Sequence, residues 1–255
     1  MDEDRAKRPV ETTVTSIRVL EALKTNGGLS LDELTDVMDL ARSTIHRHLL
    51  TLEEHGLVSR ADGTYYVGLR ALDFGIHARN RRPEFEATKE QVDTLAEETG
   101  EIAWFIARDG DFAIYLYKSG ERPLEKHSRL GQRRHLHQLA AGKVILAYLP
   151  EDERHDIIRR RGLPTRTGNT VTESETLRAE LASIRERGYA VNHRESVEGL
   201  NAVAAPIRDE DGYPLSAISI SGPARRMDRS VIEDELVNDL LAAIDTIQIQ
   251  LRYDD

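Results

Sequence analysis

Three stripes of apolar residues recur at helical spacing within the first quarter of the chain. They lie in residues 13–24, 31–38 and 45–52, and each falls on one face of a helix. Gly27 and Gly28 interrupt the pattern after the first stripe, so three short helices are predicted. We expect their apolar faces to bury against one another. The stripes consist of Val14, Ile17, Leu20 and Leu23, then Leu31, Leu34, Val37 and Met38, then Ile45, Leu49 and Leu52.

Capping residues mark where the second helix begins and the third one ends. Ser30 precedes a first turn that carries Asp32 and Glu33, which suits an N-cap and the positive end of a helix. Gly56 follows the third stripe, and glycine readily adopts the left-handed conformation with which many helices end.

A β-hairpin is predicted directly after the third helix. Residues 57–59 and 65–67 form two short strand-like runs, and Gly63 lies where a tight turn needs a positive φ. Two helices joined by a turn, a preceding helix and a following hairpin make a winged helix-turn-helix over residues 10–68. This arrangement points to DNA binding.

The third helix leaves small polar and basic side chains on its outer face. Its spacing directs His46 outward beside Arg47, whereas His48 lies toward the buried edge. Arginine can bind guanine through two hydrogen bonds, and hydroxyl groups can bind phosphates and base edges. A winged helix used for protein contacts is the alternative, because solvated polar residues would look the same. The candidate DNA-binding residues are Arg42, Ser43, Thr44, His46 and Arg47 on the helix, with Arg60 and Thr64 on the wing.

The net charge of −10 is unusual for a protein that binds DNA. Residues 1–80 hold 10 Lys and Arg against 13 Asp and Glu, so the winged-helix half is itself acidic. Because phosphate neutralisation dominates most DNA affinity, the positive groups must be concentrated locally, with Arg42, Arg47 and Arg60 as candidates.

The acidic excess and the 6 lysines against 29 arginines also suggest a halophilic source. Maximal stability at low salt would contradict that hypothesis.

Composition excludes several other classes of protein. The chain of 255 residues has no cysteine, which excludes thiol catalysis, disulfides and thiolate metal sites. No apolar run approaches the roughly 20 residues that a membrane span needs, and the charged start lacks the apolar core of a signal peptide. We expect a cytoplasmic protein with two domains.

The rest of the chain alternates helical and strand-like patterns, which indicates an α+β fold. A helical linker over residues 69–83 ends in an arginine-rich run, and a helix is expected from residue 84 to 99. Residues 161–172 are expected to form a flexible loop. Strands are predicted near 102–109, 111–119, 189–193, 200–208 and 214–221, with helices near 138–149, 151–160 and 173–187 and a closing helix that carries Val237, Leu240, Leu241, Ile244, Ile247 and Leu251.

The segment LARSTIHRHLLTLEEHGLV, at residues 40–58, followed by the YYVG wing resembles the IclR family of transcriptional regulators. LHQLAAGKVILAYLP at 136–150 and the stretch 188–223 resemble that family's effector domain, so the resemblance covers nearly the whole chain in order. It implies a GAF-like α/β effector-binding domain over residues 84–255, with homodimers or dimers of dimers that bind a double-stranded DNA operator. A small-molecule effector would control that binding, and no enzymatic activity or cofactor is implied.

The resemblance also implies a small-molecule pocket built from three segments. Small residues at the start of a helix leave backbone N–H groups free for a carboxylate, and alternating serines on a strand present both hydroxyls to one ligand. An ordinary buried strand with small side chains is the alternative. Asn192 and Ala202 depart from members that bind small acids. The neutral amide of Asn192 can still donate to a carboxylate or hydroxyl, and Lys126 and His127 lie on the segment that would cover the pocket. An anionic organic or sugar acid is therefore the leading ligand, and an aromatic acid is the second. The implied residues are Lys126, His137, Ala140, Ala141, Asn192, Leu200, Ala202, Ser219 and Ser221.

Two further interpretations of this half are weaker. His127, His135 and His137 invite a metal hypothesis, because an H-x-H pair on a strand points to one side, but no pattern supplies the remaining ligands. A hydrolytic site could be imagined from Ser219, His137 and Glu195, but the spacing of these residues does not support one, and the G-x-S-x-G motif is absent. We therefore expect neither a metal nor a catalytic residue, and His137 is predicted to bond near the pocket mouth.

Overall fold

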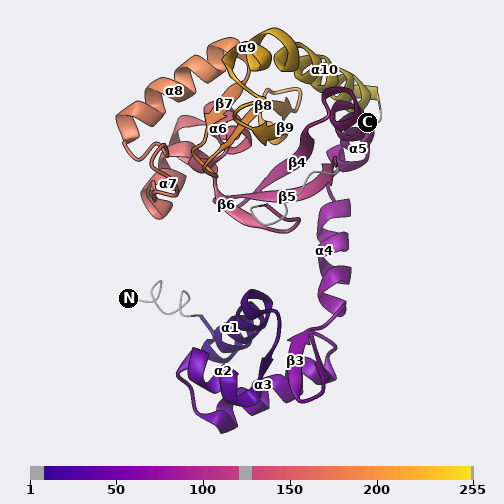
Figure 1. The fold of residues 1–255 in the computed structure, drawn as a ribbon, viewed down its shortest axis with the longest axis vertical. Helices are drawn as coiled ribbons and strands as arrows, with labels where there is room; N and C mark the ends of the chain where they lie inside the picture. Colours follow the sequence, from indigo (N-terminus) through magenta and orange to yellow (C-terminus); the bar gives the residue numbers. More distant parts are fainter. Residues whose placement is uncertain (1–8, 121–127, 254–255) are drawn as a thin grey trace. The chain divides into compact units, whose positions relative to one another are not determined.

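The computed structural model describes residues 9–120 and 128–253 and divides the chain into two compact units between Ala78 and Arg79. The first unit is a three-helix bundle with a three-stranded sheet of order β1-β3-β2 (Figure 1). Its elements are α1 (Glu11–Asn26), β1 (Leu29–Ser30), α2 (Leu31–Met38), α3 (Arg42–Glu54), β2 (Val58–Ala61), β3 (Thr64–Val67) and most of α4 (Arg70–Asn80).

The predicted caps and hairpin of the first unit are confirmed. The Ser30 hydroxyl accepts a hydrogen bond from the backbone N–H of Glu33, whose carboxylate accepts one in return from the Ser30 N–H, forming a capping box. Gly56 has φ +70° just after α3. Asp62 and Gly63 both have positive φ, which matches the twist of a two-residue hairpin turn.

Two apolar positions assigned to the buried stripes are wrong. Ile17 is 51% exposed and Val37 is 56% exposed. In α1 the buried residues are Val19 and Leu23, and Ile17 lies about 200° around the helix from Val19. In α2 the buried residues are Leu34 and Met38, one turn apart, and Val37 lies about 100° around the helix from Met38. The strand β1 was missed because its two residues carry no periodic signal.

The second unit is a six-stranded antiparallel sheet of order β6-β5-β4-β9-β8-β7. Its strands are β4 (Ile102–Asp109), β5 (Phe112–Ser119), β6 (Arg133–His135), β7 (Ala190–His193), β8 (Leu200–Arg208) and β9 (Pro214–Pro223). Its helices are α5 (Glu84–Thr99), η1 (Leu136–Gln138), α6 (Ala140–Tyr148), α7 (Glu151–Arg161), α8 (Ser174–Arg187), α9 (Arg229–Val231), η2 (Ile232–Leu236) and α10 (Val237–Tyr253).

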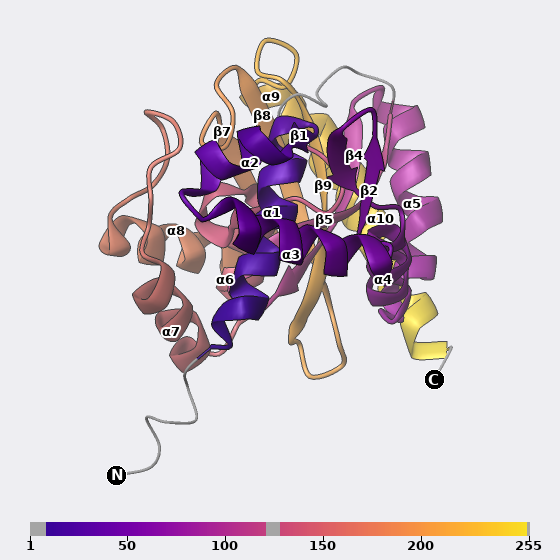
Figure 2. The same cartoon turned by 90° about the horizontal axis from the view of Figure 1, so that it is seen from below.

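Helices cover both faces of this sheet, and each face has its own apolar core. Figure 2 shows α5 and α10 on one side of the strands and α6, α7 and α8 on the other. Alternating strand residues serve the two cores: Ala217 packs toward α6, whereas Ile218 and Ile220 pack toward α10. The fold is therefore α+β, as predicted. No helix in the described part of the chain is long and apolar enough to cross a membrane.

The segment 161–172, predicted to be a flexible loop, lacks regular structure after Arg161 but is firmly attached to the sheet domain. Thr167 and Thr170 are buried, and both hydroxyls donate to the backbone carbonyl of Glu195, at 3.1 and 2.8 Å. The prediction of flexibility was wrong because these two threonines satisfy buried backbone groups, which composition does not reveal.

Candidate functional site

The outer face of α3 is polar and open. Ser43, His46 and Arg47 are exposed, and Thr44 is half-buried. His48 is half-buried instead, and its Nδ1 lies 2.8 Å from the Ser16 hydroxyl of α1. The two histidines therefore divide between the outer and inner faces as the helical spacing predicted.

The three candidate arginines differ in how strongly they are already engaged. Arg42 forms an ion pair with Asp32 of α2, and Arg60 stacks over the Tyr65 ring with its guanidinium carbon 5.1 Å from the centroid. Within residues 9–120 and 128–253, the Arg47 guanidinium makes no hydrogen bond or ion pair. Arg47 is thus the most available of the three cations for a phosphate or a base.

Thr64 is the first residue of the wing strand β3 and lies between β2 and β1, the strand that precedes α2. It is half-buried and pairs with Ser30 of β1 and with Ala61 of β2. Gly28 has φ +114°, and a Cβ there would meet the Tyr66 ring at 2.5 Å and the Thr64 methyl at 3.2 Å. The close approach of this wing strand therefore requires glycine, and Thr64 is less open than a free hairpin tip would be.

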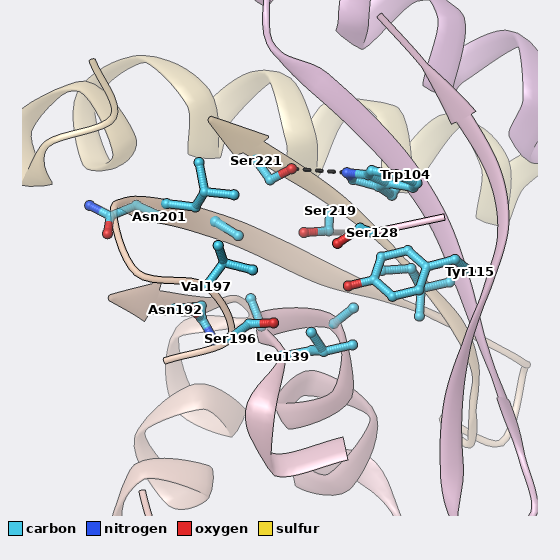
Figure 3. Close-up of a pocket in the computed structure, with 15 residues that line it drawn as sticks. Trp104, Tyr115, Ser128, Leu139, Asn192, Ser196, Val197, Asn201, Ser219 and Ser221 are labelled. Carbon is cyan, nitrogen blue, oxygen red and sulfur yellow. Dashed lines mark hydrogen bonds between the residues drawn. The ribbon is translucent and has the colours of Figure 1, made fainter. Parts of the chain in front are cut away.

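A cavity in the second unit lies between the start of α6 and the central strands β4, β9 and β8 (Figure 3). Seven of the nine residues implied by the family resemblance line it: Ala140, Ala141, Asn192, Leu200, Ala202, Ser219 and Ser221. The lining residues that sequence reasoning missed are Trp104, Ile106, Tyr115, Ser128, Leu139, Ser196, Val197 and Asn201. None of these fifteen side chains is charged at neutral pH.

The start of α6 brings unpaired backbone donors to this cavity. Its N-cap, Leu139, makes no side-chain capping bond, so the first N–H groups of the helix, including those of Ala140 and Ala141, have no partner within it. A Cβ on Gly142 would lie 2.0 Å from the Leu136 carbonyl oxygen, so the tight approach of η1 to α6 requires glycine. The positive end of the helix dipole therefore faces the cavity.

Hydroxyl groups and two aromatic rings surround the same space. Ser219 is only 4% exposed, and its hydroxyl has no partner within the described part of the chain. Ser221 accepts a 2.9 Å hydrogen bond from the indole Nε1 of Trp104, so its own proton remains available to a ligand. The Trp104 and Tyr115 rings meet edge to face at 4.9 Å. Trp104 lies opposite Ser219 in the β4–β9 pairing, a neighbour relation that the sequence alone does not contain.

Asn192 lines the cavity, but its amide already makes structural hydrogen bonds. Its Nδ2 donates to the Gln138 carbonyl at 2.8 Å, and its Oδ1 accepts from the Glu195 N–H at 3.0 Å. The expectation that this amide donates freely to a carboxylate therefore needs correction. The side chain chiefly fixes the turn before α6 to the turn after β7.

His137, predicted at the pocket mouth, is buried away from it. Its Nε2 lies 3.2 Å from the Pro164 carbonyl oxygen, and burial lowers the pKa of His137 to about 4. His135 ends β6 whereas His137 lies in η1, so the two are not on one strand and their rings are 5.8 Å apart. No cluster of three or more metal-ligating side chains occurs in the described residues, and Lys126 and His127 lie outside them.

Glu195 belongs to a buried ion cluster and not to a hydrolytic set. Lys143 of α6 is fully buried, and its Nζ lies 2.5 Å from Glu195 Oε2 and 2.7 Å from Glu180 Oε1 of α8. Burial raises the pKa of Glu195 even though Lys143 opposes that rise. His137 bonds to Pro164, and Glu195 pairs with Lys143. Neither side chain is therefore placed as a hydrolytic partner of Ser219.

Comparison with known proteins covers both units. Residues 16–62 match the IclR helix-turn-helix domain, and residues 77–249 match the bacterial transcriptional regulator IclR C-terminal domain. The probable HTH-type transcriptional regulator ArcR of Halobacterium salinarum is 32% identical over 249 residues, which span 96% of this chain and 95% of the relative. The HTH-type transcriptional regulator KdgR of Escherichia coli is 29% identical and aligns over 100% of this chain and 97% of its own.

Solved structures show the same fold. The IclR structure from Thermotoga maritima has a TM-score of 0.78 at 32% identity and covers 94% of this chain and 98% of its own. An IclR homologue from Microbacterium hydrocarbonoxydans, complexed with 4-hydroxybenzoate, has a TM-score of 0.79 at 21% identity and covers 95% and 99%. With a helix-turn-helix unit and an effector-type second domain both matched, the chain belongs to the IclR family of bacterial transcriptional regulators.

Proposed function

We propose that a small organic acid binds in the cavity of the second unit and thereby controls binding of the winged helix to an operator. The observation that carries this proposal is the uncapped start of α6 at a cavity whose lining has hydroxyls and no carboxylate. Such a site favours an anion, because the N–H groups and helix dipole attract it and no fixed acid repels it.

The lining favours an acid that also carries hydroxyl groups, such as a sugar acid. Ser219 and Ser221 are placed to hydrogen-bond hydroxyl oxygens, while Ala140, Ala141 and Leu200 would pack against a short carbon chain. An aromatic acid is the second candidate, because the Trp104–Tyr115 pair offers ring faces and edges. The complex of the Microbacterium hydrocarbonoxydans homologue with 4-hydroxybenzoate is consistent with that candidate.

Operator binding is assigned to residues 10–68, with 69–83 as the linker and 84–255 as the effector-binding domain. Arg47 would read a base or bind phosphate, supported by its exposure and unengaged guanidinium. Arg42 would have to break its ion pair with Asp32 before it could bind a DNA phosphate. The Arg60 guanidinium is already held in one orientation by the Tyr65 ring. The remaining proposed contacts are Ser43, Thr44, His46 and Thr64. Because a transcriptional regulator acts where its DNA lies, we propose that the protein acts in the cytoplasm.

Replacing Arg47 with alanine tests the proposed DNA contact. We expect Arg47→Ala to weaken binding to the DNA upstream of the protein's own gene by about tenfold or more, since a bidentate base contact contributes about 1–3 kcal/mol. Fluorescence anisotropy at fixed salt measures this, with Arg178→Ala in the second unit as the charge-matched control. Equal affinity of Arg47→Ala and wild type would exclude α3 as the reading helix.

A homodimer, or a dimer of dimers, is proposed from the exposed apolar side chains around α4. Leu69 is 87% exposed, Leu72 60% and Phe74 53%, and α4 has no buried residue. Such a surface is unfavourable in water and favours a partner copy, which also suits a palindromic operator. Sedimentation equilibrium should show a dimer for wild type and a shift toward monomer for Leu72→Glu; a monomeric wild type would contradict the proposal.

A further inference from the structure

Arginine side chains border the cavity near Tyr115 and Ser196. Arg134 of β6 pairs with Ala113 of β5, so its side chain lies on the same face of the sheet as Ala113 and Tyr115. Arg166, in the loop anchored by Thr167 and Thr170, donates from its Nε to the Ser196 carbonyl at 2.7 Å. Because Tyr115 and Ser196 both line the cavity, two guanidinium groups are held beside it by different segments.

The charges of these groups influence one another's pKa. Burial lowers the pKa of the half-buried Arg134, and the positive charges of Arg166 and Arg129 lower it further. Burial raises the pKa of the Tyr115 phenol, and the charges of Arg134 and Arg166 oppose that rise. Among the described residues, positive charge is therefore concentrated beside Tyr115, even though the cavity wall itself is uncharged.

Arg166 retains donors that a ligand can use. Only its Nε bonds to Ser196, and its two terminal nitrogens make no hydrogen bond or ion pair within residues 9–120 and 128–253. A guanidinium fixed through Nε presents its terminal N–H groups in a constant direction, which suits a carboxylate. The Ser196 contact thus holds the guanidinium beside a residue that lines the cavity.

The positive groups therefore occur in two separate places, at the start of α6 and at the arginines beside Tyr115 and Ser196. We propose that the effector carries two anionic groups, a first bound by the N–H groups of α6 and a second bound by Arg166, with Arg134 adding positive charge beside it. This inference rests on the proposed effector site and names the chemical class that the site prefers: a dicarboxylate, or an acid whose second anionic group is of comparable size. A monocarboxylate would leave the terminal N–H groups of Arg166 without an anionic ligand.

Pairs of matched acids test this inference directly. Saturated dicarboxylates of four to seven carbons and benzene-1,3- and 1,4-dicarboxylate are compared with butanoate to heptanoate and with benzoate, by thermal shift and calorimetry at constant ionic strength. We expect at least one dicarboxylate to bind roughly tenfold more tightly than its matched monocarboxylate. Arg166→Gln should remove most of that preference while leaving monocarboxylate affinity unchanged.

Arg133 provides the matched control, because it neighbours Arg134 on β6 but stacks over Phe112 on the opposite face. Arg133→Gln should keep the dicarboxylate preference. Arg134→Gln should weaken it, because a positive charge beside the second anionic group is removed. Arg166→Gln, which alters an exposed side chain, decides the matter if Arg134→Gln fails to fold. Equal binding of both acid classes, or an equal loss of both in Arg166→Gln, would overturn the inference alone. Binding of neither class would overturn the proposed effector site itself.

Discussion

At the scale of single residues, the two faces of strand β9 place serines in opposite situations. Ser219 faces the cavity with its hydroxyl free for a ligand, whereas Ser216 faces the other core and is fully buried. The Ser216 Oγ has no hydrogen-bond partner within the described part of the chain. A buried hydroxyl without a hydrogen-bond partner destabilises the fold. The Ser219 hydroxyl can offset that cost by bonding a ligand, whereas the Ser216 hydroxyl cannot.

Replacing each serine with alanine separates these two situations. Ser219→Ala should weaken binding of a cavity ligand about five- to tenfold with little change in stability, because one hydrogen bond contributes about 1 kcal/mol. Ser216→Ala should leave ligand affinity unchanged and raise the unfolding free energy by up to about 1 kcal/mol. Calorimetric titration and urea denaturation measure the two quantities. Unaltered ligand affinity in Ser219→Ala would remove this hydroxyl from the site.

His137 predicts a pH dependence of stability. Its pKa is about 4 in the folded protein, below the ordinary value of 6.5, because burial disfavours the charged ring. Between these values the unfolded chain binds more protons than the folded one, so His137 makes stability fall as pH drops from about 6.5 toward 4. Urea midpoints at pH 7 and pH 5 should therefore differ less in His137→Gln than in wild type. An identical decline in both proteins would show that this ring does not titrate as the structure implies.

At the scale of elements, α6 connects the ligand site to the rest of the domain. Its first N–H groups open on the cavity, and one turn later Lys143 is tied to Glu180 of α8 and to Glu195 after β7. Breaking a buried ion cluster by removing one partner is costly, so these contacts hold the helix start in a fixed position. A ligand bound at the start of α6, as proposed, would therefore contact a helix whose position these ion pairs fix.

The close contact at Gly142 makes this position testable. In Gly142→Ala the new methyl group would collide with the Leu136 carbonyl, a backbone atom that cannot rotate away. We expect destabilisation of about 2–3 kcal/mol and loss of ligand binding, because the helix start must shift. Gly168→Ala, at a glycine with open space around it, should change neither. Thermal unfolding and titration of both variants measure the effect, and a fully stable, ligand-binding Gly142→Ala would contradict the described geometry.

The elements that sequence could predict are those with long periodic signals or sharp stops. The capping box at Ser30 and the stripes of α3 and α10 depend on neighbouring residues, so local pattern was sufficient. Cross-strand neighbours could not be predicted, because no local sequence pattern indicates that Trp104 pairs with Ser219. His137 was misplaced for a related reason: the turn η1 rotates it away from the direction that a strand would give.

At the scale of the whole molecule, an acidic chain must bind DNA through few cations. The candidate arginines of the first unit are not equally free, since Asp32 and Tyr65 engage two of them and leave Arg47 most available. Limited affinity from one winged helix would make the proposed assembly of two copies on an operator important. A ligand that changed how two copies present their winged helices would then change operator affinity strongly, provided it binds one arrangement better than the other.

The most direct test of that claim is the operator affinity measured with and without a bound acid. The acid that gives the largest thermal shift is added at saturation, and binding to the DNA upstream of the gene is followed by fluorescence anisotropy at constant salt. We predict a change in Kd of about 5- to 150-fold, equivalent to a coupling of about 1–3 kcal/mol, and its loss in Gly142→Ala. An acid that saturates the wild-type cavity and leaves the operator Kd unchanged would contradict the account.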